Sequence, residues 1–589
     1  MTKKGLVYAG DNGDEQVTNT QFHVVAECDR VEGGDAGLLL RWINRGRGME
    51  YVVLKSQISA RGSKLLQELR SNNMLFTEST SRRLLDFLGT VQARKFVRTV
   101  GTVGWDQASG WGRPTFMLPS GEALGLGSSG QEIRFARSDV DPAKKRAKYA
   151  SAGTLEEWKT HVAARAIGNS RLILGICLAL SSPLLQVLGG TIEPGGIHMW
   201  GGNGTGKSTF SNVVASIWGD PRKITTELDG TKTGFENEAE LSSCIGLYLE
   251  EMKSDDKSIS KEIGRIIYMW ANRKGGTRSG PNIAIRETKE FDLMFSSTGE
   301  YHLKNVIEMS GGTYTGGIEA RMTSIQATPP GSTFGILDTI HDAESSKAFV
   351  DDLKKNCENL HGTAGRHFIM RLIDDITSNG RQDIQDWFSK SIQNFIQDYV
   401  PDGSDNMIHR VGKRFAFMAA VGELAASTYG TLPWPQGEAF QGVGTCFRSW
   451  LDDRGGLGAR EDILAIQQVR SFIEQHGLNR FEDIAAMRSA ITDAGGYISS
   501  SRETVGVREI TRENTYNYYV FHETWKNIIC RGIDPIRAAK AVRDAGALQT
   551  GTSGRSLTMQ KAIPGQGKTR VYVITSKILQ AGDILDDED

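Results

Sequence analysis

The sequence predicts a mixed α/β fold in which a parallel-sheet core lies between a smaller α+β region and a long helical region. Three short apolar runs, at residues 197–200, 243–249 and 291–296, have the nearly continuous apolar composition of strands buried on both faces of a parallel sheet. Helical patterns separate these runs, and such alternation is typical of α/β architecture. Beyond residue 343 the apolar spacing is helical over long stretches, which predicts a separate helical region.

The chain has 589 residues, enough for about three to five domains. We expect an N-terminal α+β domain over residues 1–137 and a basic linker over 138–153. The α/β core is expected over 154–342 and a helical lid over 343–457. A C-terminal domain is expected over 458–589.

The N-terminal domain combines alternating apolar runs with helical patterns, after a segment, residues 1–20, that has the composition of a solvated leader. Strands are predicted at 22–26, 37–43 and 49–54, and helices at 62–72 and 79–91. Basic residues beside aromatic ones support two interpretations: a DNA-binding collar, or solvated faces around core aromatics. The residues concerned are Arg41, Arg45, Arg47, Arg82, Arg83, Arg94, Lys95 and Arg98 with Trp42, Phe96 and Trp105.

Net charge and cysteine placement limit the class of protein. The formal net charge is −1, so no overall basic field indicates nucleic acid, although local patches remain compatible with it. The six cysteines form no pair at redox or zinc spacing, which predicts a reduced, cytoplasmic protein without a structural metal. The apolar run 172–188 is interrupted by Gly175, Pro183 and Gln186, so we expect a buried helix pair and no membrane contact.

The stretch 196–210 carries the most specific motif. Gly201 and Gly206 precede Lys207 and Ser208 in the pattern G-x-x-x-x-G-K-[ST], with an apolar strand before it and a helical pattern after it. The backbone amides of such a loop surround a nucleotide phosphate, and the helix N-terminus adds partial positive charge. The expected ATP-binding residues are Gly201, Gly202, Asn203, Gly204, Thr205, Gly206, Lys207, Ser208 and Thr209, with Lys207 at the β- and γ-phosphates.

Two carboxylates, Glu250 and Glu251, end the next buried apolar run. At the C-terminal edge of a parallel sheet they would face the metal and the attacking water. We expect Glu250 and the Ser208 hydroxyl to hold Mg²⁺, and Glu251 to polarise the water. Glu250 departs from the aspartate that is usual at its position.

Other positions match roles found in AAA+ ATPases. Ser297 or Thr298, at the polar end of the third run, is the candidate sensor of the γ-phosphate, with an ordinary strand terminus as the alternative. Arg321 precedes a predicted strand at 322–327, where it can act as an arginine finger toward a neighbouring subunit; a surface ion pair is the alternative. In the lid, Arg410 or Arg414 is a candidate second sensor of ATP, and Arg414 is our choice for the nucleotide contact.

A glycine-rich basic stretch covers residues 273–286 and contains Arg273, Lys274, Arg278 and Arg286 beside turn-forming residues. Cations on such a turn can contact DNA phosphates without reading sequence, which suits a motor. A solvated surface loop is the alternative. We expect Lys274, Arg278 and Arg286 to bind DNA.

The end of the chain predicts a small winged-helix domain. Helices are expected over 461–475 and 535–545, followed by a turn-rich segment and a strand at 571–574. Residues 565–569 imitate a phosphate loop, but Ala562 stands where the first glycine is required. We therefore expect this turn to form the wing.

Several stretches together resemble the bacterial family called domain of unknown function 927, from about residue 22 to residue 580. Besides the phosphate loop they are Gly168-Asn-Ser-Arg-Leu, Thr233-Gly-Phe-Glu, Phe295-Ser-Ser-Thr-Gly-Glu, Gly362-Thr-Ala-Gly-Arg, Arg414-Phe-Ala, Ala420-Val-Gly-Glu-Leu-Ala and Arg454-Gly-Gly. This family is associated with phages, integrative elements and resistance cassettes, and it includes MCM-like AAA+ helicases of mobile genetic elements. The resemblance implies a ring, commonly a homo-hexamer, that threads DNA through a central pore.

The sequence therefore predicts an ATP-dependent ring-shaped DNA helicase for replication of a phage or mobile genetic element, acting on single-stranded or forked DNA. A primase or single-strand-binding protein encoded nearby would suit such an enzyme as a partner. Two other classes stay open: a nucleotide-switched DNA-binding initiator or loader, and a phage-defence ATPase without motor activity.

Overall fold

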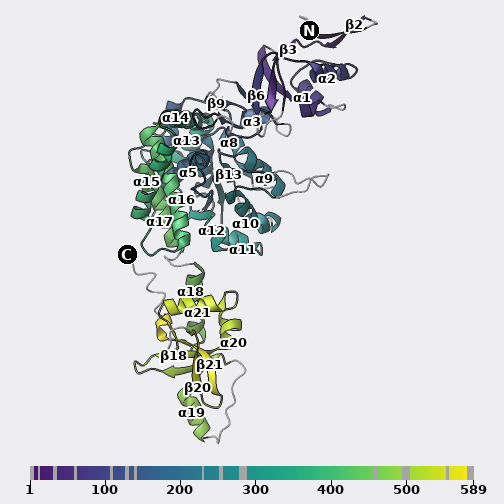
Figure 1. The fold of residues 1–589 in the computed structure, drawn as a ribbon. Coiled ribbons are helices and arrows are strands. Elements are labelled where there is room, and N and C mark those ends of the chain that lie inside the picture. Colours follow the sequence, from purple (N-terminus) through teal and green to yellow (C-terminus); the bar gives the residue numbers. More distant parts are fainter. Residues whose placement is uncertain are drawn as a thin grey trace. The chain divides into compact units, whose positions relative to one another are not determined.

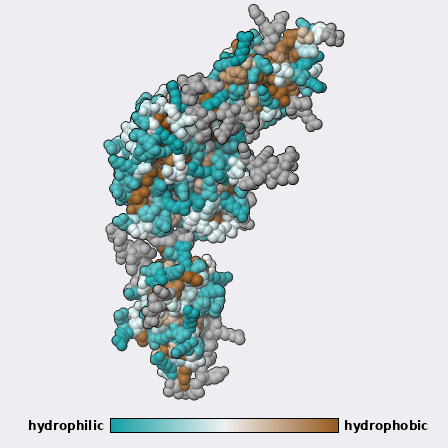
Figure 2. All heavy atoms as spheres, in the orientation of Figure 1, coloured by the Kyte–Doolittle hydropathy of each residue, from teal (hydrophilic) through white to brown (hydrophobic). Residues whose placement is uncertain are grey.

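The structure is a computed structural model, and it describes all residues except 1–4, 11–12, 31–35, 45, 59–62, 107–109, 126–131, 138–141, 228–230, 251–256, 277–287, 455–459, 494–503, 552–555 and 580–589. The chain divides into two compact units (Figure 1): unit 1 is Met1–Val400 with Arg410–Trp450, and unit 2 is Pro401–His409 with Leu451–Asp589. In Figure 2 the visible surface is largely hydrophilic, with small hydrophobic areas. Among the described residues, no helix combines the length and the apolar composition needed to cross a bilayer.

Unit 1 begins with an α+β domain built on a five-stranded sheet of order β10-β6-β3-β4-β5. Its elements are β3 Phe22–Arg30, β4 Gly37–Asn44, β5 Arg47–Leu54, α1 Ser63–Ser71, α2 Ser81–Thr90, β6 Phe96–Val100 and β10 Ile133–Phe135. A small sheet of β7 Gly104–Trp105, β8 Phe116–Met117 and β9 Ala123–Leu124 follows β6 in the chain. The strands and helices predicted between residues 22 and 91 are confirmed.

The first described residues form a strand pair that the sequence interpretation missed. β1 (Leu6–Gly10) and β2 (Gly13–Thr18) pair antiparallel, and Leu6 and Val17 join the hydrophobic core of the N-terminal domain. The expectation of a solvated leader is therefore wrong for this part. β2 carries one apolar side chain among polar ones, so periodicity alone could not reveal its pairing.

Residues 142–148, within the expected linker, form α3 (Pro142–Lys148) and pack against the core. The Lys145 ammonium nitrogen lies 3.5 Å from a carboxylate oxygen of Glu238, on α9 (Lys232–Leu241), and Lys148 also pairs with this carboxylate. Burial alone would raise the pKa of Glu238, but the two ammonium groups outweigh it and lower the pKa. Ion pairing thus attaches α3 to α9.

The core of unit 1 is a five-stranded parallel sheet of order β12-β13-β14-β11-β15. Its strands are β11 Gly196–Trp200, β12 Thr226–Glu227, β13 Leu247–Glu250, β14 Phe295–Gly299 and β15 Met322–Gln326. The intervening helices are α7 Lys207–Ser216, α8 Pro221–Ile224, α9, α10 Lys257–Ala271, α11 Leu303–Met309 and α12 Gly316–Glu319. All carboxyl ends of the strands therefore lie at one edge of the sheet.

Helices cover both faces of this sheet (Figure 1). Residues of α9, α10 and α11 form one hydrophobic cluster with Leu249 of β13 and Phe295 of β14. On the other face α7 packs against β13 and β14, and α5 and α13 pack against α7. The expected buried helix pair is confirmed as α5 (Ser170–Ser181) and α6 (Leu184–Val187), and every residue of α5 is buried.

Two strands of the core are short, for local reasons. Residues 221–224 form α8 because the Asp220 side chain accepts a hydrogen bond from the Arg222 amide and Pro221 fits the first helical turn, so β12 is only Thr226–Glu227. The run from residue 243 becomes a strand only at Leu247, because Cys244 and Gly246 have φ values of 59° and 112°. Such left-handed residues form a turn before β13.

Five long helices complete unit 1 and lead into unit 2: α13 Ser346–Asn359, α14 Thr363–Asn379, α15 Arg381–Tyr399, α16 Asn406–Glu423 and α17 Glu438–Arg454. The long helical stretches predicted beyond residue 343 are confirmed, and they begin with α13 to α16. Their buried side chains include Phe368, Phe388 and Phe415. These residues recur at helical spacing, which is why the sequence pattern located them.

Unit 2 has a sheet of order β16-β17-β18-β21-β19, with β20 paired to β21. Its elements are α18 Arg460–His476, β16 Phe481–Asp483, α19 Ile484–Asp493, β17 Gly506–Ile510, β18 Tyr516–Phe521, α20 His522–Thr524, α21 Pro535–Asp544, β19 Leu548–Gln549, β20 Met559–Ile563 and β21 Gly567–Ile574. The helices α18 and α21 and the strand at 571–574 are as predicted. Residues 564–566 form the tight turn of the β20–β21 hairpin.

Candidate functional site

The loop at residues 201–206 joins β11 to α7 and requires glycine at two described positions. Gly204 and Gly206 have φ values of 78° and 96°, which disfavour other residues. A Cβ atom on Gly206 would lie 2.6 Å from Cγ2 of Ile336, so this glycine also permits close contact with the loop after β15. The backbone is thus held in the curved form expected of a phosphate cradle.

The polar groups of this loop are arranged to receive an anion. Among the described residues, the amides of 202–206 donate to no other group, while the ammonium of Lys207 lies 2.6 Å from the Gly201 carbonyl oxygen and 2.8 Å from that of Gly202. The exposed residue Ser208 and buried Thr209 follow in the first turn of α7. Amides, a helix N-terminus and a lysine therefore converge at one place.

The polar ends of β13 and β14 lie at the same edge of the sheet as this loop. β14 is inserted between β11 and β13, with Ser297 opposite both His198 and Leu249. Glu250 is the half-buried last residue of β13, and Thr298 is the buried penultimate residue of β14. Glu251 lies outside the described residues. The sheet thus brings Glu250, Ser297 and Thr298 to the edge that carries Lys207.

Sequence reasoning missed one buried polar residue of this site, His198. It lies on β11 with no exposed surface and contacts the Ser297 hydroxyl and the Tyr301 carbonyl. A histidine inside a strand otherwise apolar, directly before the loop, was the available signal. Its partners are far away in sequence, so their identity needed the fold.

Arg321 lies at the opposite edge of the sheet. It stands between α12 and β15, and its carbonyl accepts a hydrogen bond from the amide of Gly196, the first residue of β11. Its half-buried guanidinium lies 4.3 Å from the ring centroid of Tyr268 and donates to the Gly317 carbonyl at 3.0 Å. Since β11 separates this residue from the loop, Arg321 does not join the loop of its own subunit.

Arg414 and Arg410 also lie at this amino-terminal edge. Arg414 is 2% exposed and donates to the Ala320 carbonyl at 2.7 Å, beside Arg321, while burial lowers its pKa to about 10. Arg410 pairs with Glu193 at 2.6 Å. A contact between Arg414 and a nucleotide in the loop of the same subunit does not fit this placement.

Comparison with known proteins adds a family-model match and a fold. Residues 2–290 match the family described as "Domain of unknown function (DUF927)". A solved structure titled "SCCmec type IV Cch - active helicase" is similar over 100% of both chains, with a TM-score of 0.67 and 16% sequence identity, which establishes a shared fold. No curated protein matches the sequence.

The DUF927 match ends at residue 290, so it includes the whole basic stretch and excludes Ser297, Thr298 and Arg321. Lys274, near the start of this stretch, forms an antiparallel bridge with Glu290, which follows the stretch in the chain, and their side chains pair at 3.2 Å. Arg273 pairs with Asp292 at 2.9 Å. Arg278 and Arg286 lie outside the described residues. The side chain of Lys274 is 64% exposed.

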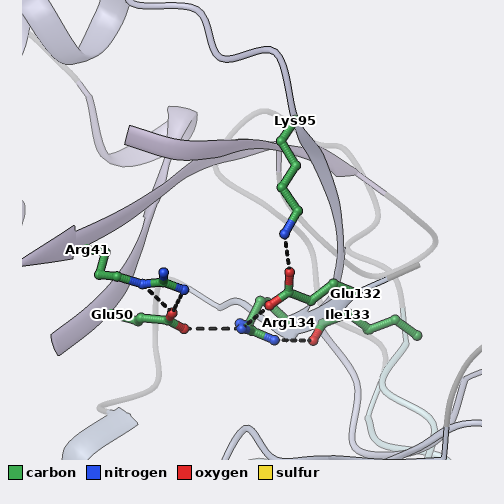
Figure 3. A network of polar contacts seen from close by, with 6 residues as sticks. All are labelled: Arg41, Glu50, Lys95, Glu132, Ile133 and Arg134. Carbon is green, nitrogen blue, oxygen red and sulfur yellow. Dashed lines mark hydrogen bonds and ion pairs between the residues drawn. The ribbon is translucent and has the colours of Figure 1, made fainter. Parts of the chain in front are cut away.

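The basic residues of the N-terminal domain are largely paired with carboxylates. In Figure 3, Arg134 lies between Glu50 and Glu132, which also pair with Arg41 and Lys95 respectively. The Lys95 hydrogen bond lowers the pKa of Glu132. Arg83 and Arg98 also pair, with Glu15 and Asp106, while Trp42 and Trp105 are core residues. This pairing favours the solvated-face interpretation, and the side chains of Arg45 and Arg47 lie outside the described residues.

Proposed function

We propose that unit 1 contains a P-loop AAA+ ATPase core that binds ATP at residues 201–209. One observation carries the proposal: the unengaged amides of 202–206 and the Lys207 ammonium converge at the sheet edge where β13 and β14 end in polar residues. In such parallel sheets, ligands usually bind outside the carboxyl ends of the strands. The residues present suit a triphosphate.

The same residues suit Mg²⁺. Ser208 supplies an exposed hydroxyl and Glu250 a carboxylate, both oxygen ligands of the kind that this ion prefers. When bound, the ion would neutralise charge on the phosphates. Lys207 binds and orients the β- and γ-phosphates, and Glu251 accepts the proton of the attacking water.

We further propose a homo-hexameric ring in which Arg321 serves the neighbouring subunit. Support comes from its place at the sheet edge opposite its own loop, on a half-buried site stacked over Tyr268. A guanidinium at this position can contact a nucleotide only when that nucleotide is bound to another copy of the chain. Arg410 lies at the same edge. We assign the second-sensor role to Arg410 in preference to the buried Arg414.

The proposed activity is separation of DNA strands during replication of a phage or mobile element. The match of residues 2–290 to DUF927 and a fold shared along the full chain with a protein titled an active helicase support this activity. The β20–β21 hairpin following α21 in unit 2 suits a winged-helix domain that contacts DNA. That feature also fits an initiator or loader, which would bind DNA without displacing a strand.

The basic stretch provides a test of how DNA is held. Lys274→Ala with Arg278→Ala should abolish unwinding and weaken DNA stimulation while basal ATPase survives, because the cations contact phosphates and not ATP. Each lost phosphate contact should lower the slope of log affinity against log salt by about one unit. Fluorescence anisotropy on single-stranded DNA at several salt concentrations measures this slope.

A matched control replaces two exposed cations of the helical region, Lys390→Ala with Arg371→Ala, and should unwind DNA as the wild type does. If the Lys274 and Arg278 variant unwinds at the wild-type rate, the stretch is an ordinary surface loop. DNA binding would then have to be sought elsewhere in the chain.

A further inference from the structure

The buried imidazole of His198 connects three points of the proposed ATPase site. Its Nδ1 atom lies 2.7 Å from the Ser297 hydroxyl oxygen of β14, and its Nε2 atom lies 2.9 Å from the Tyr301 carbonyl oxygen. The residue has no exposed surface. It therefore spans from the strand that leads into the phosphate loop to the strand that carries both candidate sensors.

The partners determine the protonation state of this ring. A carbonyl oxygen only accepts hydrogen bonds, so Nε2 carries the hydrogen, and in the neutral ring Nδ1 then offers a lone pair. The Ser297 hydroxyl must therefore donate its hydrogen to Nδ1. Burial lowers the pKa of His198 to about 4, and the nearby charge of Lys207 acts in the same direction, so the ring is neutral near pH 7.

The alternation of β14 separates the two candidate sensors. Phe295 lies in the hydrophobic cluster with α9, α10 and α11, so Ser297, two residues further on, faces the same side. Thr298 faces the opposite side, where α7 packs against β13 and β14. Since α7 begins with Lys207, Thr298 shares a face with the helix that carries the phosphate-binding lysine.

Side chains of β11 also contact the segment that follows β14. Tyr301 precedes His302, whose side chain caps α11 by accepting from the Lys304 amide at 3.0 Å. Trp200, on the same face of β11 as His198, contacts the His302 ring edge-on with centroids 5.7 Å apart. Two alternate side chains of β11, both on one face, therefore contact the segment at the exit from β14.

We propose that His198 is a positioning residue that fixes the Ser297 hydroxyl and the Tyr301 carbonyl, and that Thr298 is the side chain that contacts the γ-phosphate. This inference rests on the proposed ATPase function and decides between its two candidate sensors. Ser297 has already given its only hydroxyl hydrogen to His198, whereas a γ-phosphate requires a donor. Thr298 lies on the face of the sheet that carries α7 and Lys207, so we assign that contact to Thr298, and the histidine keeps the strand in place for it.

The test begins with two isosteric changes read by ATP turnover and by binding of a fluorescent ATP analogue. Thr298→Val should lower kcat by about 10²-fold, the usual effect of removing one transition-state donor. Ser297→Ala should lower kcat by only about three- to tenfold, as expected for one lost neutral hydrogen bond. The dissociation constant of the analogue should change less than about twofold in both, because Lys207 and the loop amides remain.

Two histidine variants then separate positioning from general packing. His198→Asn keeps an acceptor near the Nδ1 position, whereas His198→Phe removes it. Ser297→Ala should therefore lower kcat by the same factor in the His198→Asn background as in the wild type. In the His198→Phe background, Ser297→Ala should lower kcat no further. Thr298→Val should lower kcat by about the same factor in every background, since Thr298 does not act through the histidine.

Three results would overturn the inference. The first is a larger decrease in kcat for Ser297→Ala than for Thr298→Val, and the second is wild-type turnover in Thr298→Val. The third is a decrease in the double variant Ser297→Ala with His198→Phe that equals the product of the two single decreases. The cycle of Ser297→Ala with His198→Phe is also measured by thermal unfolding, which does not involve hydrolysis, and should again be non-additive. If Lys207→Ala retains wild-type turnover, the ATPase proposal fails, while the unfolding cycle still tests the hydrogen bond itself.

Discussion

Lys207→Ala should abolish ATP hydrolysis. The contacts of the ammonium with the Gly201 and Gly202 carbonyls place it where the β- and γ-phosphates would lie. Removing a preorganised charge from a phosphoryl-transfer site costs about 10²- to 10³-fold in kcat. Phosphate release under excess ATP and Mg²⁺ measures the effect.

Two further variants make this result specific. Glu251→Gln should show a similar loss of turnover while ATP still binds, since it removes the proposed base and leaves the cradle. Lys390→Ala, an exposed lysine on α15, should hydrolyse ATP at the wild-type rate. Wild-type turnover in both Lys207→Ala and Glu251→Gln would show that the site is assigned wrongly.

Mixing Arg321→Ala protein with Glu251→Gln protein should restore hydrolysis that neither has alone. An arginine finger is worth about 10³- to 10⁵-fold in kcat, so each pure ring should be nearly inactive. In a mixed ring, a subunit with intact Glu251 meets a neighbour with intact Arg321, and that interface holds a complete site. Turnover across a series of mixing ratios, with subunit exchange verified, measures the recovery.

The control mixes Lys207→Ala with Glu251→Gln. Both groups act on the nucleotide of their own subunit, so every site in such a ring has one defect and no ratio should recover activity. Equal behaviour of the two mixtures would count against a finger that acts between subunits. Recovery limited to the Arg321 mixture would place Arg321 at the neighbour's nucleotide.

Much of the core was predictable because its signals are local. Gly201 to Ser208 form a contiguous motif, and the helices α13 to α16 bury side chains at helical spacing, so both appear in the sequence itself. The placement of Glu250 near Ser297 and Thr298 follows from parallel strands, whose carboxyl ends share an edge. These parts depend on short stretches and on one rule of sheet geometry.

The remaining features depend on contacts between distant residues. The Ser297 partner of His198 lies on another strand, and Arg414 is buried against Ala320 of a separate segment. A basic residue in a helix gives no sign of which sheet edge it will reach, so the sequence placed Arg414 near ATP. The β1–β2 pair was missed because β2 carries one apolar side chain, Val17, among polar ones, although Leu6 and Val17 anchor the pair.

The central claim is that ATP hydrolysis by this chain separates DNA strands. Labelled forked DNA with 3′ and 5′ single-stranded tails, incubated with ATP and Mg²⁺, measures this by release of the displaced strand. We predict displacement by the wild type and none by Lys207→Ala at equal DNA occupancy. Wild-type protein that hydrolyses ATP and binds the fork, yet releases no strand from either tail, would contradict the claim and indicate a loader or a defence ATPase.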